Sequence, residues 1–389
     1  MKAVILAAGE GTRLRPLTET MPKPMVPLID RPLLELLVDV LRRQGFDEII
    51  IATAYLAPQI ENYFRDGFHF GVHIAYSFEG YHLDGRAIRE PLGAAGGLKK
   101  IQDTSGFFDD TFAVLCGDML IDVDLGRLLE FHRAKSAVAT MLLRDVPRGD
   151  VSKYGVVDIA EDGRIRTFQE KPAVEDAVGS TINAGVYLFE PRALEWIPSN
   201  RPFDIAIDFF PALLRAGAPF YGLAVPCTWI DIGRISDYWR ATRMILNGEV
   251  NFIQMPGKEV APNVWTGINL AMDASKVDIR GPVSIGSSTK IENGVTIIGP
   301  TVIGRNSVIE TGARIESCIV GDYTRISGFA DVRHKIISGQ FCVDQHGHSV
   351  DLAHSGYTFL VDDARERRRW DADQEALMNF LRAEVMTLG

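Results

Sequence analysis

The chain has 389 residues, of which 46% are hydrophobic and 24% are charged, so it is long and apolar enough for two domains with sizeable cores. Its formal net charge of −10 argues against nucleic acid or an anionic membrane surface as the main partner, because both require a dominant basic face. A polyanionic ligand would therefore need a local cationic pocket.

Cysteine spacing and hydropathy indicate the compartment. The four cysteines do not have metal-binding spacing, which favours reduced, buried thiols over a disulfide framework or a zinc site. The longest apolar stretch, residues 33–41, contains two acidic residues and is too short to span a bilayer. The first 13 residues end in charged side chains and lack the pattern of a signal peptide. We therefore expect a soluble cytoplasmic enzyme.

Strands and helices alternate in the first 145 residues or so. Residues 2–6 predict a buried strand that ends in a glycine-rich loop. Residues 33–44 predict an amphipathic helix with Asp30 as N-cap and Gly45 after its end. Further strands are predicted at 48–52, 72–78, 111–115 and 137–143, and helices at 93–102 and 124–134. This alternation predicts an α/β domain with a Rossmann-like, mostly parallel mixed sheet, and a ligand beyond the carboxyl ends of its strands.

A six-residue repeat follows. Isoleucine recurs at a spacing of six, and the residue two positions earlier is small or β-branched each time. This period fits neither a helix nor an alternating strand, but it is typical of short parallel strands on the faces of a triangular solenoid. We predict a left-handed parallel β-helix of hexapeptide repeats. The seven isoleucines are Ile279, Ile285, Ile291, Ile297, Ile303, Ile309 and Ile315.

The predicted domains follow from these patterns. The first domain covers residues 1–245, and a linker rich in glycine and proline covers 246–262. The β-helix covers 263–345. Residues 346–389 form a C-terminal helical tail, with a charged amphipathic helix over 362–388.

The glycine-rich loop from Gly9 to Arg13 allows the backbone to approach a phosphate chain closely. It is not a dinucleotide-binding fingerprint, because Leu14 stands at the position of the third glycine and Pro16 would disrupt the following helix. It also lacks the Gly-Lys-Ser/Thr of a P-loop. Lys23 follows between two prolines, which position its ammonium at low entropic cost. For Lys23 alone, a rigid surface turn with a solvated cation remains the alternative.

Residues 9–24 resemble the signature of the sugar-1-phosphate nucleotidyltransferases, G-x-G-T-R-x-x-P-L-T followed by P-K-P. In that family a hexad domain follows the catalytic domain in branches that make GDP-mannose, ADP-glucose or UDP-N-acetylglucosamine. The motif layout is most similar to bacterial mannose-1-phosphate guanylyltransferases and to a cyanobacterial type of UDP-glucose pyrophosphorylase. The resemblance continues through Leu92–Gly97, Gly117-Asp118, Tyr154-Gly155, Glu170–Pro172, Asn183–Gly185 and Trp229–Asp231.

The resemblance implies that a sugar 1-phosphate and a nucleoside triphosphate react to give a nucleotide sugar and pyrophosphate. It implies Mg²⁺ on Asp118 and Asp231, and such a pair suffices because Mg²⁺ also takes phosphate oxygens and waters. It implies Arg13 for the β and γ phosphates, Lys23 for the α-phosphoryl group and Lys171 for the sugar phosphate. The implied nucleotide-binding residues are Leu6, Ala8, Gly9, Gly11, Thr12, Arg13, Glu79 and Gly93, and the implied sugar-phosphate-binding residues are Tyr154, Gly155, Glu170, Lys171 and Asn183.

The identity of the base depends on one residue. Glu79 stands where the family reads the edge of the base, and a carboxylate only accepts hydrogen bonds. This suits the two donors of guanine better than the mixed edge of uracil. The chain departs from the family by an insertion over residues 80–89 and by Ala94 in place of a frequent threonine. We therefore predict mannose-1-phosphate guanylyltransferase activity, with UDP-glucose formation as the alternative.

Two other functions fit the sequence less well. A non-catalytic nucleotide-sugar-binding regulatory subunit is disfavoured because the implied lysines and metal carboxylates are all present. An acyltransferase in the β-helix would need a histidine base, but His334 lies after the seven hexads. His346 and His348 lack a third metal ligand. We assign the β-helix to structure and to assembly of a homo-oligomer.

Overall fold

The computed structural model describes residues 1–84, 86–366 and 376. The chain divides into two compact units. The first contains Met1–Thr12, Leu17–Val26 and Arg31–Ile232, and the second contains Arg13–Pro16, Pro27–Asp30 and the described residues from Gly233 onward. The domain boundaries given above remain predictions. Every helix in the described part of the chain is too short or too polar to span a bilayer.

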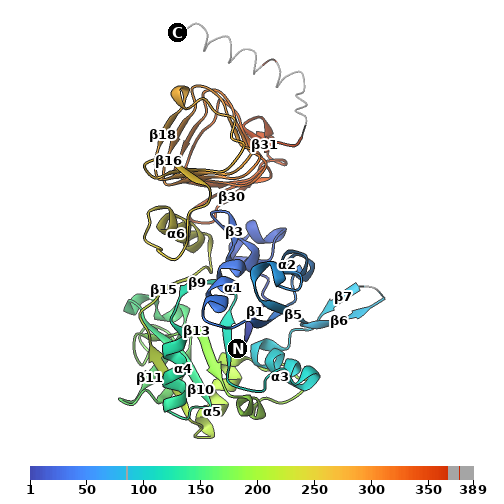
Figure 1. Ribbon diagram of the computed structural model, residues 1–389, viewed down its shortest axis with the longest axis vertical. Helices are drawn as coiled ribbons and strands as arrows, with labels where there is room; N and C mark the ends of the chain where they lie inside the picture. Colours follow the sequence, from blue (N-terminus) through green and yellow to red (C-terminus); the bar gives the residue numbers. More distant parts are fainter. Residues whose placement is uncertain (85, 367–375, 377–389) are drawn as a thin grey trace. The chain divides into compact units, whose positions relative to one another are not determined.

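The first unit is built on a nine-stranded mixed sheet (Figure 1). One half is parallel, in the order β8-β1-β4-β5, and the other half, from β13 to β12, is mainly antiparallel. The strands are β1 (Lys2–Ala7), β4 (Glu48–Thr53), β5 (His73–Phe78), β8 (Phe112–Cys116), β10 (Ala139–Asp145), β11 (Gly155–Ile159), β12 (Ile165–Glu170), β13 (Thr181–Phe189) and β14 (Phe220–Ala224).

Helices cover both faces of this sheet, as the alternating pattern predicts. Ile5 of β1 belongs to a core cluster with Leu34 of α1, whereas the next residue toward the N-terminus, Val4, belongs to a cluster with Leu98 of α3. Successive strand residues point to opposite faces, so β1 is buried on both sides. The helices are α1 (Leu33–Arg43), α2 (Ala57–Phe64), α3 (Gly93–Ser105), α4 (Leu125–Ala134) and α5 (Phe210–Arg215), with α6 (Ile235–Leu246) in the second unit.

The strands and helices predicted in the parallel half are confirmed to within three residues at each end, but α2 was not predicted. One detail was wrong: α1 begins after Pro32 without a side-chain cap, so Asp30 is not its N-cap. The sheet is less parallel than expected, because antiparallel pairs join β10 to β13, β11 to β13 and, as a hairpin, β11 to β12. The sheet is mixed, as predicted from the sequence.

The second unit contains a parallel β-helix of three sheets. The strands of the first sheet are β17 (Val264–Thr266), β19 (Val283–Ile285), β22 (Thr301–Ile303), β25 (Ile319–Val320) and β28 (Lys335–Ile337), and those of the second are β18 (Asp278–Arg280), β21 (Thr296–Ile298), β24 (Arg314–Glu316) and β27 (Asp331–Arg333). The third sheet contains β20 (Lys290–Ile291), β23 (Val308–Ile309) and β26 (Thr324–Ile326). Antiparallel strands β16 (Lys258–Ala261), β29 (Phe341–Asp344), β30 (Ser349–Asp351) and β31 (Val361–Asp363) extend these sheets.

The register explains why the six-residue spacing ends at Ile315. Ile279 pairs with Ile297, and Ile291 pairs with Ile309, so one coil takes three hexads. In the next coil Ile309 pairs with Ile326, which is one residue less. The spacing then continues in a shifted register at Val320 and Ile326, and both of these side chains are buried. The β-helix therefore extends beyond the seven hexads counted in the sequence.

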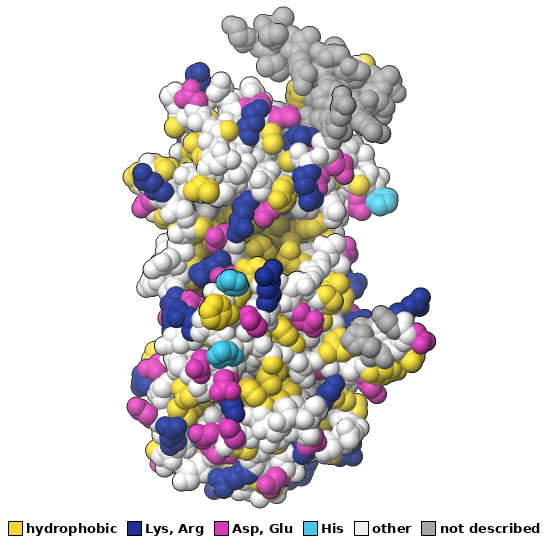
Figure 2. All heavy atoms as spheres, turned by 45° about the vertical axis from the view of Figure 1, so that its right-hand side comes forward, with side chains coloured by type: hydrophobic (Ala, Val, Ile, Leu, Met, Phe, Trp, Pro, Cys, Tyr) yellow, Lys and Arg dark blue, Asp and Glu magenta, His cyan; other side chains and the backbone are white. Residues whose placement is uncertain are grey.

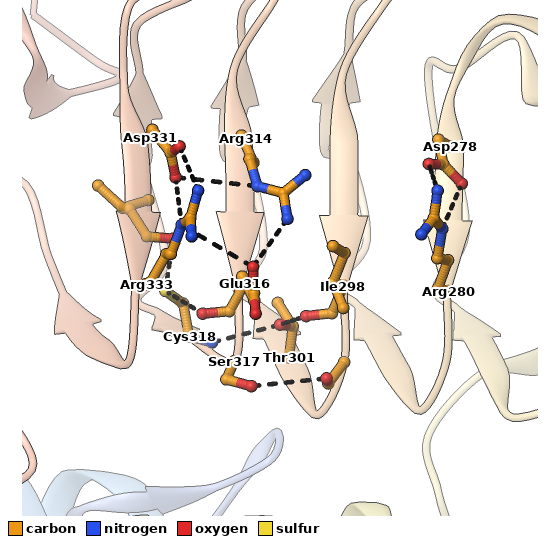
Figure 3. Close-up of polar contacts among 12 residues, drawn as sticks. Asp278, Arg280, Ile298, Thr301, Arg314, Glu316, Ser317, Cys318, Asp331 and Arg333 are labelled. Carbon is orange, nitrogen blue, oxygen red and sulfur yellow. Dashed lines mark hydrogen bonds and ion pairs between the residues drawn. The ribbon is translucent and has the colours of Figure 1, made fainter.

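Charged residues that flank the central hydrophobic residue of a strand pair along the outside of the second sheet (Figure 3). Arg314 contacts Glu316 at 2.8 Å, and Arg333 contacts Asp331 at 2.7 Å. Longer contacts join neighbouring strands, with 3.9 Å between Arg314 and Asp331. Exposed pairs of this kind contribute little stability each. Charges of both signs are also interspersed over the face of the molecule that Figure 2 shows.

The C-terminal segment differs from the predicted helical tail in its described part. Residues 361–363 form strand β31, which pairs antiparallel with β26, and Asp362 forms an ion pair with Arg325 at 3.2 Å. Residues 361–363 therefore add a strand at the edge of β26. Residues 367–375 and 377–388 of the predicted helix lie outside the described residues.

Candidate active site

The glycine loop and Asp118 leave the sheet side by side. Strands β1 and β8 are parallel neighbours, with Leu6 opposite Cys116. The backbone N–H of Gly117 donates to the carbonyl of Leu6 at 2.9 Å, and a Cβ at Gly117 would lie 2.7 Å from that oxygen. Only glycine fits at this point. Both segments therefore lie at the carboxyl edge of the parallel half, where a ligand was expected.

Lys23 is held under the glycine loop. Its Nζ lies 2.6 Å from Oδ2 of Asp118, and its side chain is only 9% exposed. Gly11 has φ of 65°, and a Cβ there would lie 2.7 Å from Cβ of Lys23. Thr18 fixes the same loop, because its hydroxyl donates to the carbonyl of Gly11 at 2.8 Å. This burial rules out the alternative of Lys23 as a solvated surface cation.

Asp231 reaches the same place on another strand. Strands β9 (Met119–Asp122) and β15 (Thr228–Asp231) pair antiparallel, with Asp231 opposite Met119. The N–H of Ile232 donates to the carbonyl of Asp118 at 2.9 Å. Burial raises the pKa of the Cys116 thiol, and the charges of Asp118 and Asp231 raise it further. The two aspartates are therefore brought together beside Cys116.

These two carboxylates fit a hard cation that shares its other ligands with substrate. Within the described residues, no group of three or more His, Cys, Asp or Glu side chains is arranged to hold a metal. Mg²⁺ is commonly held by one or two carboxylates together with phosphate oxygens and waters. The histidine pair His346 and His348 does not offer a better site, since His348 is 83% exposed and contacts Asp344. The donor set suits Mg²⁺ that arrives with a triphosphate.

A second group of candidates forms a row across β12, β11 and β13. Glu170 is opposite Gly155, and the pairing of Val156 with Ile182 brings Asn183 to the other side of Gly155. Residues directly opposite each other on neighbouring strands project to the same face. A Cβ at Gly155 would lie 2.5 Å from the Phe168 ring and 3.1 Å from Oε2 of Glu170. Glycine therefore lets both side chains approach the backbone of β11 closely.

The amide of Asn183 has a fixed orientation. Its Nδ2 donates to the hydroxyl of Tyr187 at 2.8 Å, and its Oδ1 accepts from the N–H of Gly185 at 2.9 Å. Burial raises the pKa of Tyr187 well above its ordinary value, so the phenol stays neutral. One N–H of the amide and one lone pair of its oxygen are left for a hydroxyl group. Tyr187 was not among the residues implied by the sequence.

Lys171 is the exposed cation of this row. It has φ of 45°, and its N–H donates to the carbonyl of Tyr154 at 3.1 Å. Its Nζ lies 2.5 Å from Oε1 of Glu170, and its side chain is 59% exposed. The left-handed backbone turns the chain out of β12, and the ammonium remains at the surface.

Trp229 links the aspartates to this row. Its indole N–H donates to the carbonyl of Ala184, next to Asn183, at 2.8 Å. Its ring packs edge-to-face on Tyr154 with 5.4 Å between centroids. Because Asp231 follows two residues later on the same strand, Trp229 connects β15 to β11 and β13. The sequence motif contained Trp229 but assigned it no role.

Glu79, which follows β5, is buried against the first turns of α3 rather than open to solvent. It is 6% exposed, and this burial raises the pKa of its carboxyl, against the opposing effects of the Leu92 backbone N–H and the charge of Lys100. A Cβ at Gly97 would lie 3.1 Å from Oε1 of Glu79.

The other nucleotide candidates are half-buried (Leu6, Ala8, Gly93) or exposed (Gly9, Thr12, Arg13).

Comparison with known proteins identifies the family of each part of the chain. Residues 2–248 match the family model described as nucleotidyl transferase, and residues 282–317 match six repeats of the bacterial transferase hexapeptide. The chain belongs to the nucleotidyl transferase family. The predicted enzyme class and the predicted hexapeptide repeats are thereby confirmed.

Similar proteins carry two kinds of activity in their names. The UTP–glucose-1-phosphate uridylyltransferase of a Synechocystis species is 49% identical over 365 residues, which cover 94% of each chain. A mannose-1-phosphate guanylyltransferase of Mycobacterium tuberculosis is 36% identical over 247 residues, covering 63% of this chain and 65% of that protein. The structure of HddC from Yersinia pseudotuberculosis with GMP-PN has 27% identity and a TM-score of 0.52, covering 63% of this chain and 99% of HddC.

Proposed function

We propose that this enzyme transfers a uridylyl group from UTP to glucose 1-phosphate, giving UDP-glucose and pyrophosphate. The observation that carries the proposal is the 49% identity with the Synechocystis uridylyltransferase over 94% of both chains. The guanylyltransferase of Mycobacterium tuberculosis is less similar and matches only 63% of this chain. This reverses the order given by the sequence, where formation of GDP-mannose came first.

The argument for guanine also loses its physical basis. It required the carboxylate of Glu79 to face the edge of the base. The side chain is 6% exposed, and it interacts with the backbone N–H of Leu92 and the charge of Lys100. An acceptor engaged in this way contributes little to the choice between guanine and uracil.

The reaction needs alignment and charge neutralisation rather than a general base. A phosphate oxygen of the sugar 1-phosphate is already anionic, and it forms a bond to the α-phosphorus of the triphosphate. The bond from the α-phosphorus to the oxygen bridging to the β-phosphorus breaks, and its electron pair leaves with pyrophosphate. Such transfers depend on positioned cations and on in-line geometry.

The first group of residues would receive the triphosphate. The ammonium of Lys23, which lies on Asp118 at 2.6 Å, would bind the α-phosphoryl group, and exposed Arg13 would bind the β and γ phosphates. Asp118 and Asp231 would hold Mg²⁺. When bound, the cation supplies positive charge to the phosphate oxygens. The close fit of Gly11 against Lys23 supports this role, because it couples the loop to the ammonium.

The row across β12, β11 and β13 would receive the sugar phosphate. Lys171 would bind its phosphate, and Glu170 and Asn183 would contact sugar hydroxyls on either side of Gly155. Tyr154 would support this group from its contact with Trp229. We further propose that the β-helix assembles a homo-oligomer and that the enzyme is cytoplasmic.

A substrate matrix tests the proposal. Release of pyrophosphate is measured for ATP, CTP, GTP and UTP against the 1-phosphates of glucose, mannose and N-acetylglucosamine. We expect UTP with glucose 1-phosphate to have the highest kcat/KM. The highest value for GTP with mannose 1-phosphate would restore the guanylyltransferase hypothesis. No turnover of any pair would favour a non-catalytic regulatory subunit.

A further inference from the structure

The insertion over residues 80–89 is a two-stranded hairpin that projects from the first unit between β5 and α3 (Figure 1). Its strands are β6 (Gly80–Leu83) and β7 (Arg86–Arg89). The proposed function gives this hairpin no role. An isolated hairpin of this size is marginally stable in water. The contacts at its base therefore determine how it is held.

The base of the hairpin is fixed to the end of β5. Gly80 and Arg89 are opposite each other in the first pair of the hairpin. The N–H of Glu90 donates to the carbonyl of Glu79 at 3.1 Å. The ammonium of Lys100 on α3 donates to the carbonyl of Phe78 at 2.7 Å. The backbone of Arg89 thus has a defined place beside the parallel half of the sheet.

The side chain of Arg89 contacts the glycine-loop segment directly at Glu10 and indirectly through Tyr55. Its guanidinium forms an ion pair with the carboxylate of Glu10, between Gly9 and Gly11. It also lies 5.6 Å from the centroid of the Tyr55 ring. The hydroxyl of Tyr55 donates to the carbonyls of Thr18 and Glu19 at 3.0 and 3.1 Å.

We propose that Arg89 is a positioning residue for the nucleotide-binding loop. With Glu10 and Tyr55 it forms a loop clamp that holds the start of the segment directly and its end through the tyrosine. A loop that binds phosphate through backbone N–H groups binds more tightly when its conformation is fixed beforehand. The clamp acts on binding of the triphosphate and leaves the sugar-phosphate row untouched. This inference rests on the proposed function for the identity of the substrate.

Kinetics of four variants test the clamp. Arg89→Gln should raise KM for UTP by roughly fivefold to twentyfold, because it removes an exposed ion pair and a cation–π contact. KM for glucose 1-phosphate and kcat should stay within about twofold, as expected when only binding of one substrate is weakened. Arg89→Lys should restore part of the loss. Glu10→Gln combined with Arg89→Gln should be no worse than Arg89→Gln alone. Arg86→Gln, on the same hairpin, is the control and should behave as wild type.

A measurement without substrates separates positioning from direct phosphate binding. Amide hydrogen exchange of the full chain should be faster over residues 8–20 in Arg89→Gln than in Arg86→Gln, because the loop has lost a restraint. Unchanged KM for UTP, or unchanged exchange in that segment, would overturn the inference. If wild type does not use UTP, the proposed function fails, and the clamp is then tested with the triphosphate that wild type accepts.

Discussion

The two halves of the candidate site hold their cations in different ways. On the proposed nucleotide side, Lys23 is 9% exposed and lies 2.6 Å from Asp118. On the proposed sugar-phosphate side, Lys171 is 59% exposed and pairs with its neighbour Glu170. Removing the carboxylate of Asp118 would leave the buried ammonium of Lys23 poorly solvated, whereas water compensates an exposed cation such as Lys171. Substitutions in the first half should therefore affect both chemistry and stability, and those in the second half should affect mainly binding.

The largest effect is expected at the aspartates. Asp118→Asn and Asp231→Asn should each lower kcat by about 100-fold or more, since they remove charge stabilisation of the transition state. Both variants should remain folded by circular dichroism. Steady-state pyrophosphate release with UTP and glucose 1-phosphate measures the change. Turnover close to wild type in either variant would contradict the metal assignment.

Lys23→Met tests most clearly whether the two halves of the candidate site differ in their effect on stability. It leaves Asp118 without its ion-pair partner, but this carboxylate is 38% exposed and water compensates it in part, so the free energy of unfolding should fall by about 0.5–1 kcal/mol. Activity should also fall by about 100-fold. Urea unfolding compares it with Lys171→Met, which should keep wild-type stability. Equal stability of the two variants would remove the distinction between a buried and an exposed cation.

Lys171→Ala should sharpen the assignment of the second half. It should raise KM for glucose 1-phosphate by about tenfold or more, because a charge-assisted contact to phosphate is lost. KM for UTP should change much less. Arg13→Ala should show the opposite pattern. If both variants weakened binding of the same substrate, the division of roles would be wrong.

Tyr187→Phe tests the support behind the second half. The hydroxyl of Tyr187 accepts from Nδ2 of Asn183, so its loss frees the amide to rotate. KM for glucose 1-phosphate should rise by roughly twofold to tenfold, the range of one neutral hydrogen bond. Tyr76→Phe is a matched control, because its hydroxyl bonds the carbonyl of Arg65 elsewhere. A wild-type KM in Tyr187→Phe would show that Asn183 needs no such support.

Glu79 should show the smallest effect, on pH dependence of stability. Burial raises the pKa of its carboxyl above the ordinary 4.5. The folded state then holds the proton more tightly than the unfolded state. The stability that this bound proton contributes is complete below pH 4.5 and is lost as pH rises through the folded pKa. Wild type should therefore lose stability relative to Glu79→Gln between pH 4 and 8. A constant difference across that range would contradict the burial argument.

Sequence alone predicted the regular parts of the molecule. The isoleucine spacing predicted the β-helix because each hexad repeats the same local environment, but it could not predict the shortened coil before Ile326. The parallel half was predicted because its strands and helices alternate along the chain. In the antiparallel half only the strand over 137–143 was predicted, and the pairs of β13 with β10 and β8 join segments that are distant in sequence.

The site was predicted as a set of residues and not as a geometry. The signature motifs named Lys23 and Asp118, but nothing in them indicates that two side chains 95 residues apart form an ion pair. Trp229, Tyr187 and Arg89 act through neighbours, so their types alone give no functional signal. Only their positions near Asp231, near Asn183 and at the end of the insertion could have drawn attention to them.

The most direct test of the central claim follows the oxygen atoms of the reaction. Glucose 1-phosphate with ¹⁸O in its phosphate is incubated with UTP, Mg²⁺ and the wild-type enzyme, and products are followed by ³¹P NMR. Attack by the sugar phosphate on the α-phosphorus predicts UDP-glucose with ¹⁸O in the bridging position and pyrophosphate without label. Label in pyrophosphate, or no UDP-glucose at all, would contradict the account.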